Sequence, residues 1–197
     1  MELLLPLMSF VIVSTITPGP NNLLLAASGM NFGFRATVPH LLGIHLGIYT
    51  MSLMCAFGLN QWLLAFPGAE LALKLFGSAY LLWLAWKLIG LEMTAGGDEH
   101  ARPMTWWQAA IFQFSNPKAW MMVTTGIGLA LPASSSGFEA GLWLIAGFGT
   151  LGMICNCIWV QLGKALQQSH QIPARRRWIN GVLVLMVLAT VLLFWLG

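Results

Sequence analysis

Thr17-Pro18-Gly19-Pro20-Asn21-Asn22 interrupts the first apolar segment of the chain. Its two prolines remove backbone donors and clash with the preceding helical turn, and the glycine between them adds conformational freedom. A helix that passes through this run must therefore break or kink. A second polar run, Gln113-Phe114-Ser115-Asn116-Pro117-Lys118, interrupts a later apolar segment in the same way. The two runs predict two broken helices.

The composition places these helices in a membrane. Hydrophobic residues make up 58% of the 197 residues, charged residues only 8%, and the mean hydropathy is +0.77. A soluble protein of this length needs far more charge to cover its surface. The sequence contains no phosphate-binding loop with Lys-Ser/Thr and no soluble catalytic motif. It therefore predicts neither an enzyme nor an ATP-driven machine, and no cofactor or metal.

The apolar segments predict the number of membrane crossings. About 20 apolar residues span a hydrocarbon core of about 30 Å. We therefore predict an all-α integral membrane protein, a single domain over residues 1–197, with six transmembrane helices. Their expected ranges are residues 3–27, 38–62, 69–90, 107–131, 138–162 and 178–196.

The basic residues predict the orientation. Lysine and arginine favour cytoplasmic loops, and the basic residues of the connecting loops fall on one side of the predicted layout. Both termini are then expected outside the cytoplasm. The run Arg175-Arg176-Arg177 is better explained as this signal than as a nucleic-acid patch. The basic residues of these connecting loops are Arg35, Lys87, Arg102, Lys164, Arg175, Arg176 and Arg177.

Six helices with both ends outside form two halves that run in opposite senses. We predict an inverted repeat, with one half over about 1–90, a flexible link over about 91–106 and a second half over about 107–197. The breaks then lie in the first helix of each half, and counting residues inward from opposite faces allows them to meet near mid-membrane. Such paired breaks are typical of secondary transporters, whose substrate binds where unwound backbone lines a cavity.

The breaks supply groups that suit a small zwitterion. Freed carbonyls and amide oxygens accept from an ammonium group, while amide NH2 groups, helix N-termini and a lysine hold a carboxylate. The alternative is that the prolines are packing kinks whose freed groups bond to neighbouring helices. The expected substrate-binding residues are Thr17, Pro18, Gly19, Pro20, Asn21, Asn22, Gln113, Asn116, Pro117 and Lys118, with Ser115 beside them.

Several motifs together resemble the LysE/RhtB superfamily of amino-acid exporters over essentially the whole chain. They are the first run with Gly33-Phe34-Arg35, the Gly43-x-x-x-Gly47 step, Ala79-Tyr80-Leu81-Leu82-Trp83-Leu84-Ala85-Trp86-Lys87, and Asn116-Pro117-Lys118-Ala119. The resemblance implies amino-acid efflux across the bacterial inner membrane, driven by an ion gradient, with protons as the coupling ion. Among branches, the first run with Gly33-Phe34-Arg35 is more similar to exporters of neutral amino acids, such as cysteine and O-acetylserine or homoserine and threonine. The family motif carries over to Gly19, Pro20, Asn22, Asn116 and Pro117.

The coupling group is harder to assign, because every acidic residue falls in a loop or at a helix end. An ionisable group inside a membrane helix is costly enough to be a functional candidate. We consider His45 and Lys118 the coupling candidates. Close helix approach at the Gly43–Gly47 step is the structural alternative for His45, and snorkelling to the cytoplasmic side is the alternative for Lys118.

Two other function classes compete with transport of an amino acid. A thiol-redox relay needs cysteines that can meet, whereas Cys155 and Cys157 point about 200 degrees apart on a helix and the broken helices have none. A channel or structural membrane subunit would not require two matched breaks. The expected partners are an amino-acid substrate, a coupling proton and membrane lipid, with no nucleic acid. Gly-rich helix faces leave a homodimer open.

Overall fold

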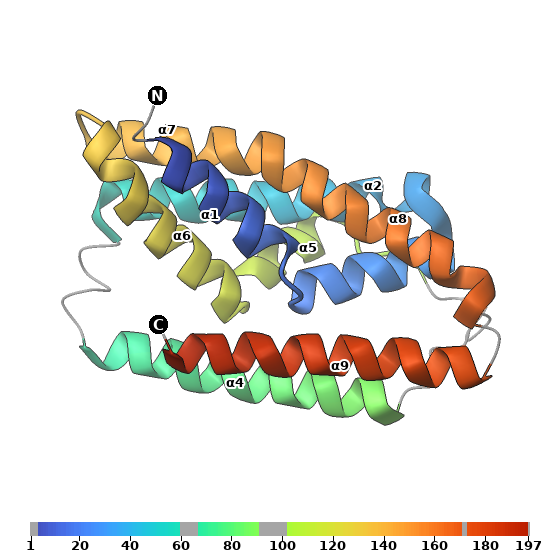
Figure 1. Ribbon diagram of the computed structural model, residues 1–197. Coiled ribbons are helices and arrows are strands. Elements are labelled where there is room, and N and C mark those ends of the chain that lie inside the picture. Colours follow the sequence, from blue (N-terminus) through green and yellow to red (C-terminus); the bar gives the residue numbers. More distant parts are fainter. Residues whose placement is uncertain (1–3, 60–66, 91–101, 171–172, 197) are drawn as a thin grey trace.

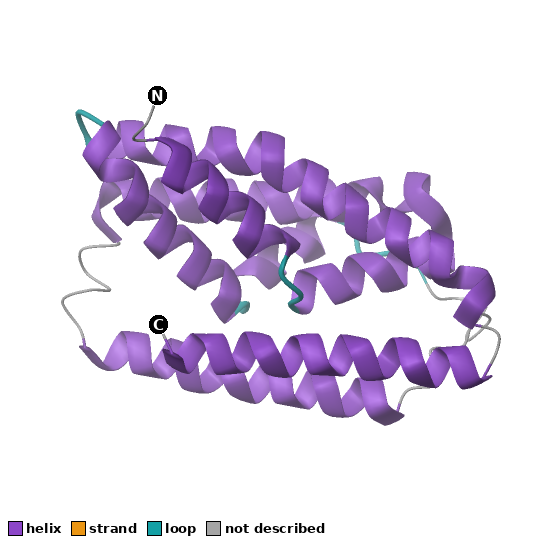
Figure 2. Ribbon diagram, viewed as in Figure 1, coloured by secondary structure: helices purple, strands orange, loops and turns teal. Residues whose placement is uncertain are grey.

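The computed structural model describes residues 4–59, 67–90, 102–170 and 173–196. Over these residues every regular element is a helix and no strand occurs (Figure 2). The prediction of an all-α fold is confirmed. The prolines and glycines that interrupt the apolar segments determine where the elements begin and end.

The first broken helix consists of α1, residues Leu5–Ile16, and the start of α2, residues Pro20–Met54. α2 itself reverses direction at Gly33, whose φ of 77° is unfavourable for a residue with a side chain. Its limbs, residues 20–32 and 34–54, fold back on each other (Figure 1). The Ser28 and Thr37 hydroxyls join the limbs at 2.8 Å. The second helix thus begins four residues earlier than expected and carries Pro39 inside it.

The second broken helix consists of α5, residues Trp106–Phe114, and α6, residues Pro117–Ala130. A 3-10 turn, η3 at Leu131–Ala133, leads to α7, residues Gly137–Gly147, a π-helical turn η4 at Phe148–Gly152, and α8, residues Met153–His170. This continuous helical column is longer than the expected span of residues 138–162. A second π-helical turn, η2 at Cys55–Leu59, follows α2.

Two long helices form a separate antiparallel pair beside the others: α4, residues Pro67–Gly90, and α9, residues Pro173–Leu196 (Figure 1). α9 begins five residues before the expected range, at a proline that suits the first helical turn. The pair joins the remaining helices through a small apolar cluster in which Leu23 of α2 and Met121 of α6 pack with Leu81, Ala85 and Val187.

Glycines let the two limbs of α2 approach their neighbours closely. A Cβ on Gly29 would lie 2.2 Å from the Val160 carbonyl oxygen, and one on Gly163 would lie 1.9 Å from the Ala26 oxygen, so residues 20–32 and α8 are in backbone contact. On the second limb, Gly43 and Gly47 face α5 in the same way. Close approach at the Gly43–Gly47 step is therefore real, and its partner is α5.

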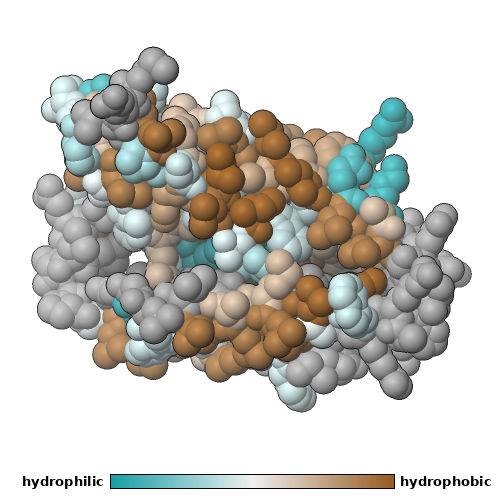
Figure 3. All heavy atoms as spheres, viewed as in Figure 1, coloured by the Kyte–Doolittle hydropathy of each residue, from teal (hydrophilic) through white to brown (hydrophobic). Residues whose placement is uncertain are grey.

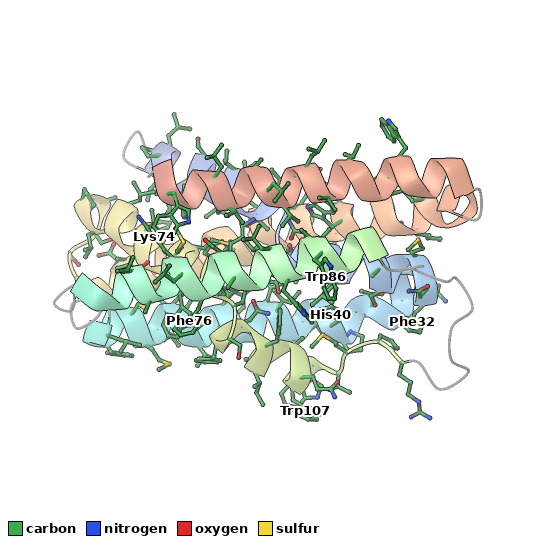
Figure 4. All side chains as sticks on the ribbon, turned by 90° about the horizontal axis from the view of Figure 1, so that it is seen from below. Phe32, His40, Lys74, Phe76, Trp86 and Trp107 are labelled. Carbon is green, nitrogen blue, oxygen red and sulfur yellow. The ribbon has the colours of Figure 1, made fainter. Side chains whose placement is uncertain are left out.

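Apolar side chains cover much of the described surface on the face that Figure 3 shows. Phe57 and Phe76 are 75% exposed and Trp86 is 69% exposed. Figure 4 places Phe76 and Trp86 along α4 and shows Trp107 pointing outward from α5. Two described helical stretches, Pro20–Leu59 and Gly137–Leu166, are long and apolar enough to cross a membrane, although the first folds back at Gly33. Such a surface suits lipid and would be unfavourable in water.

Two tryptophans bond to the ends of the broken helices. Trp159 is buried and its indole donates to the Ile16 carbonyl at 3.1 Å. Trp120 is half-buried and donates to the Phe114 carbonyl at 2.9 Å. Each indole thus bonds to the end of a half-helix beside a break.

Candidate functional site

The first break leaves the end of α1 without a helical continuation. Gly19 and Pro20 start α2, with Pro20 at the first helical position, where a missing donor costs nothing. Asn22, which is buried, turns back across the gap and donates through Nδ2 to the Thr15 oxygen at 2.8 Å and the Thr17 oxygen at 2.7 Å. One amide therefore satisfies two of the carbonyls that the break has freed.

The second break is shorter and is closed by its own cap. The Asn116 side chain accepts from the Lys118 backbone N–H at 3.2 Å, and Pro117 occupies the first helical position of α6. The Asn116 backbone N–H donates to the Gln113 oxygen at 3.0 Å. Asn116 is therefore the N-cap of α6, and the proline that follows it suits the first helical position.

Side chains join the two breaks directly. Asn21 Nδ2 donates to Gln113 Oε1 at 2.8 Å, and Gln113 Nε2 donates to Asn21 Oδ1 at 3.1 Å, which makes a reciprocal amide pair. Lys118 reaches the other way, and its Nζ donates to the Thr17 and Pro18 carbonyl oxygens. Residues about 100 positions apart in the chain thus meet, as the two runs predicted.

A small cavity of about 30 Å³ lies beside these breaks. One wall is polar and comes from the breaks, and the other is apolar and comes from α2, α6 and η4. The lining residues are Ser14, Thr15, Gly19, Asn21, Asn22, Ile44, His45, Ile48, Asn116, Lys118, Met122, Phe148 and Asn156.

His45 and Asn156 also line the cavity. Asn156 Nδ2 lies 3.3 Å from His45 Nε2, so the pair links α2 to α8, while the other ring nitrogen of His45 is buried without a partner among the described residues. The Tyr49 ring lies 5.8 Å from the His45 ring between centroids. Asn156 thus makes an interhelical hydrogen bond while lining the cavity.

The expected site residues divide into two groups. Gly19, Asn21, Asn22, Asn116 and Lys118 line the cavity, as does the coupling candidate His45. The others, Thr17, Pro18, Pro20, Gln113 and Pro117, shape the breaks or hold the lining residues without lining the cavity themselves.

Sequence reasoning missed the whole apolar wall and the two hydroxyls of α1. Thr15 Oγ1 is buried without a hydrogen-bond partner among the described residues. It lies three residues before Pro18, so the break itself was the signal that could have found it. Nothing in the sequence distinguishes the apolar lining residues from other core residues. The missed residues are Ser14, Thr15, Ile44, Ile48, Met122 and Phe148.

The amide pair leads to a stability prediction. Changing Gln113 to Leu leaves the partly buried Asn21 amide without this partner and should lower the free energy of unfolding by about 1 kcal/mol. The additional change Asn21→Leu should recover part of the loss. Thermal unfolding of Gln113→Leu, of Asn21→Leu and of the double variant would measure this coupling. Additive losses at Asn21 and Gln113 would contradict the pairing.

The cysteines occupy packing positions. Cys55 lies in η2, Cys155 and Cys157 lie in α8, and all three are free thiols. Cys55 and Cys155 are buried among apolar side chains. None of the three lines the cavity.

Comparison with known proteins decides the family. The profile described as "LysE type translocator" matches residues 12–196. The chain belongs to the LysE family. The resemblance read from the sequence motifs is therefore confirmed, and as a LysE translocator the chain is a multi-pass protein of the bacterial inner membrane and not an enzyme.

The names of proteins similar to this LysE protein state what those proteins transport. It is 32% identical over 184 residues to a protein named "Cysteine/O-acetylserine efflux protein" of Escherichia coli O139:H28 (strain E24377A / ETEC), with 91% of each chain covered. The proteins of the same name from Escherichia coli (strain K12) and Shigella flexneri are 32% identical over 183 residues, which cover 91% of this chain and 90% of theirs. No solved structure matches this chain significantly.

Proposed function

We propose that this LysE protein exports small neutral amino acids or close derivatives from the cytoplasm, with cysteine and O-acetylserine as the first candidates. The observation that carries the proposal is that two helix breaks, one from each half of the sequence, meet at a single cavity. The names of the relatives supply the chemical class of the substrate.

The cavity suits a small amino acid in each of its parts. The start of α2 has no side-chain cap, so its first backbone N–H groups can receive a carboxylate. The carbonyls at the end of α1 can receive an ammonium group. The apolar wall of Ile44, Ile48, Met122 and Phe148 then accommodates a short side chain.

The transport cycle we propose is alternating access coupled to protons. The two halves, residues about 1–90 and 107–197, would act as inverted three-helix repeats that rock about the joined breaks, with the cavity near the membrane midplane and both termini outside the cytoplasm. Lys118 and His45 are the ionisable groups of the cavity and hence the coupling candidates. Membrane lipid covers the apolar surface, and a homodimer is compatible with the fold.

Counterflow and efflux measurements test this function. Purified protein in proteoliposomes should exchange radiolabelled cysteine or O-acetylserine at least about tenfold faster than protein-free liposomes, whereas a basic amino acid such as lysine should exchange at background. In cells, efflux of the preloaded amino acid should be sensitive to a protonophore. Background exchange for the whole panel, with the protein confirmed in the membrane, would reject amino-acid export and favour the channel or structural alternative.

A further inference from the structure

The side chain of Lys118 occupies the place where the two breaks meet. Lys118 lies at the start of α6 and is 8% exposed, and its Nζ donates to the Thr17 and Pro18 carbonyls at the end of α1. The lysine stem passes over Gly19 so closely that a Cβ there would lie 2.7 Å from Cδ and 3.0 Å from Nζ. Gly19 thus leaves room for the lysine.

The partners of this ammonium are neutral. Of the carboxylates, only Glu139 has a described side chain, and it accepts hydrogen bonds from Ser135 and Trp143 near the start of α7. The Lys118 ammonium is instead held by carbonyl dipoles at a helix C-terminus, the end that favours a cation. These carbonyls have the chemistry that an amino acid's own ammonium requires.

Two ammonium groups cannot occupy the same carbonyls together. Like charges a few ångströms apart repel strongly where water is excluded. We propose that the Lys118 ammonium fills the substrate's ammonium subsite in the empty transporter, and that substrate and the Lys118 proton replace each other there. This inference rests on the proposed export function and specifies how export is coupled.

The cycle balances in protons and charge. Cytoplasmic substrate places its ammonium on the Thr17 and Pro18 carbonyls, and the displaced Lys118 releases one proton to the cytoplasm and becomes a neutral amine. The loaded protein turns outward and substrate leaves. Lys118 then takes one proton from outside and returns to the carbonyls. One zwitterion moves out and one proton moves in, so one positive charge enters per cycle.

Among the described residues, His45 is the one other titratable group that lines this cavity. The other described titratable side chains on the elements packed against α6 do not line it, and α1 and α5 carry none in their described ranges. His45 is hydrogen-bonded to Asn156. The Lys118 variants distinguish a coupling role of His45 from one of Lys118. The non-lining groups are Arg35, His40 and Tyr49 of α2, Cys55 of η2, Lys74 of α4 and Glu139 of α7.

The variant Lys118→Met tests the inference in proteoliposomes with radiolabelled cysteine. In the wild type, one proton per substrate predicts that one pH unit, with the membrane potential clamped at zero, sustains about a tenfold cysteine ratio. In Lys118→Met, counterflow should remain above background, at a rate altered by the loss of the ammonium, while the sustained ratio falls to one. Lys118→Arg retains a cation that cannot give up its proton, so it should lose both activities. Exposed Lys164→Met is the matched control and should behave as the wild type.

Each outcome has a separate meaning. A tenfold ratio sustained by Lys118→Met would overturn this coupling role and point to His45, while export itself stands. Lys118→Met removes the ammonium that we place in the substrate's subsite. Loss of counterflow in a Lys118→Met protein that remains monodisperse would therefore overturn the proposal that substrate displaces this ammonium. Independently of any variant, cysteine added to wild-type vesicles without a pH gradient should move one proton in the opposite direction, and no proton movement would overturn the inference. Absence of wild-type counterflow would reject the proposed function instead.

Discussion

Replacing Asn22 with alanine is expected to reduce export to background while the protein remains folded in the membrane. The Asn22 amide holds the carbonyls of Thr15 and Thr17 across the first break, at 2.8 and 2.7 Å. Two hydrogen bonds worth about 1–1.5 kcal/mol each correspond to about a 30- to 150-fold loss in the population of the binding geometry. The change also alters the carbonyls that we assign to the substrate ammonium.

Counterflow in proteoliposomes measures this loss, and size-exclusion chromatography in detergent checks the fold. The matched control is Asn31→Ala, an exposed asparagine on the same limb of α2, which should retain wild-type rates. Asn116→Ala, which removes the cap of α6, should behave like Asn22→Ala. Normal export by both Asn22→Ala and Asn116→Ala would show that the breaks do not form the substrate site.

Replacing Gly163 with alanine is expected to prevent stable folding. The new Cβ would lie 1.9 Å from the Ala26 carbonyl oxygen and 2.6 Å from its carbon, so backbone and not a flexible side chain would have to move. Overpacking in a well-packed interior costs about 1–3 kcal/mol, and a clash with the Ala26 backbone should reach the upper end of that range. The contact that would open is the one between α8 and residues 20–32, which carry Asn21 and Asn22.

The yield of monodisperse protein and its thermal unfolding temperature measure this effect. Gly128→Ala in α6 is the matched control, because a Cβ there meets nothing within 4 Å and alanine is the better helix former. Equal yield and equal thermal stability for Gly163→Ala and Gly128→Ala would contradict the close helix contact.

The positions of the breaks could be predicted because proline and glycine act locally. Pro18, Pro20 and Pro117 each remove a donor whatever surrounds them, so the ends of α1 and α5 follow from the sequence alone. The contact between the two breaks also followed from the sequence, because the breaks interrupt helices of opposite halves at depths that allow them to meet. Pro39 shows the limit of this reasoning, since it lies inside α2 without ending it.

The sequence could not predict which residues of a helix face lipid, a neighbouring helix or the cavity. Hydropathy cannot tell a lipid-facing residue from a buried one in a membrane helix, because both are apolar. Phe148 and Met122, which line the cavity, therefore could not be distinguished from other core residues. The same limit concealed that Gly43 and Gly47 face α5, whereas His45 faces α8 and the cavity.

The pair formed by Asn21 and Gln113 has a consequence for how the transporter responds to its surroundings. Both partners are uncharged amides, and each donates to and accepts from the other. This amide pair therefore has nothing to titrate and no net charge for a membrane voltage to pull. Acidification or a change in potential would leave the pair unaltered, so in the proposed cycle a bacterium's energy state would act on the two breaks through Lys118, which also joins them.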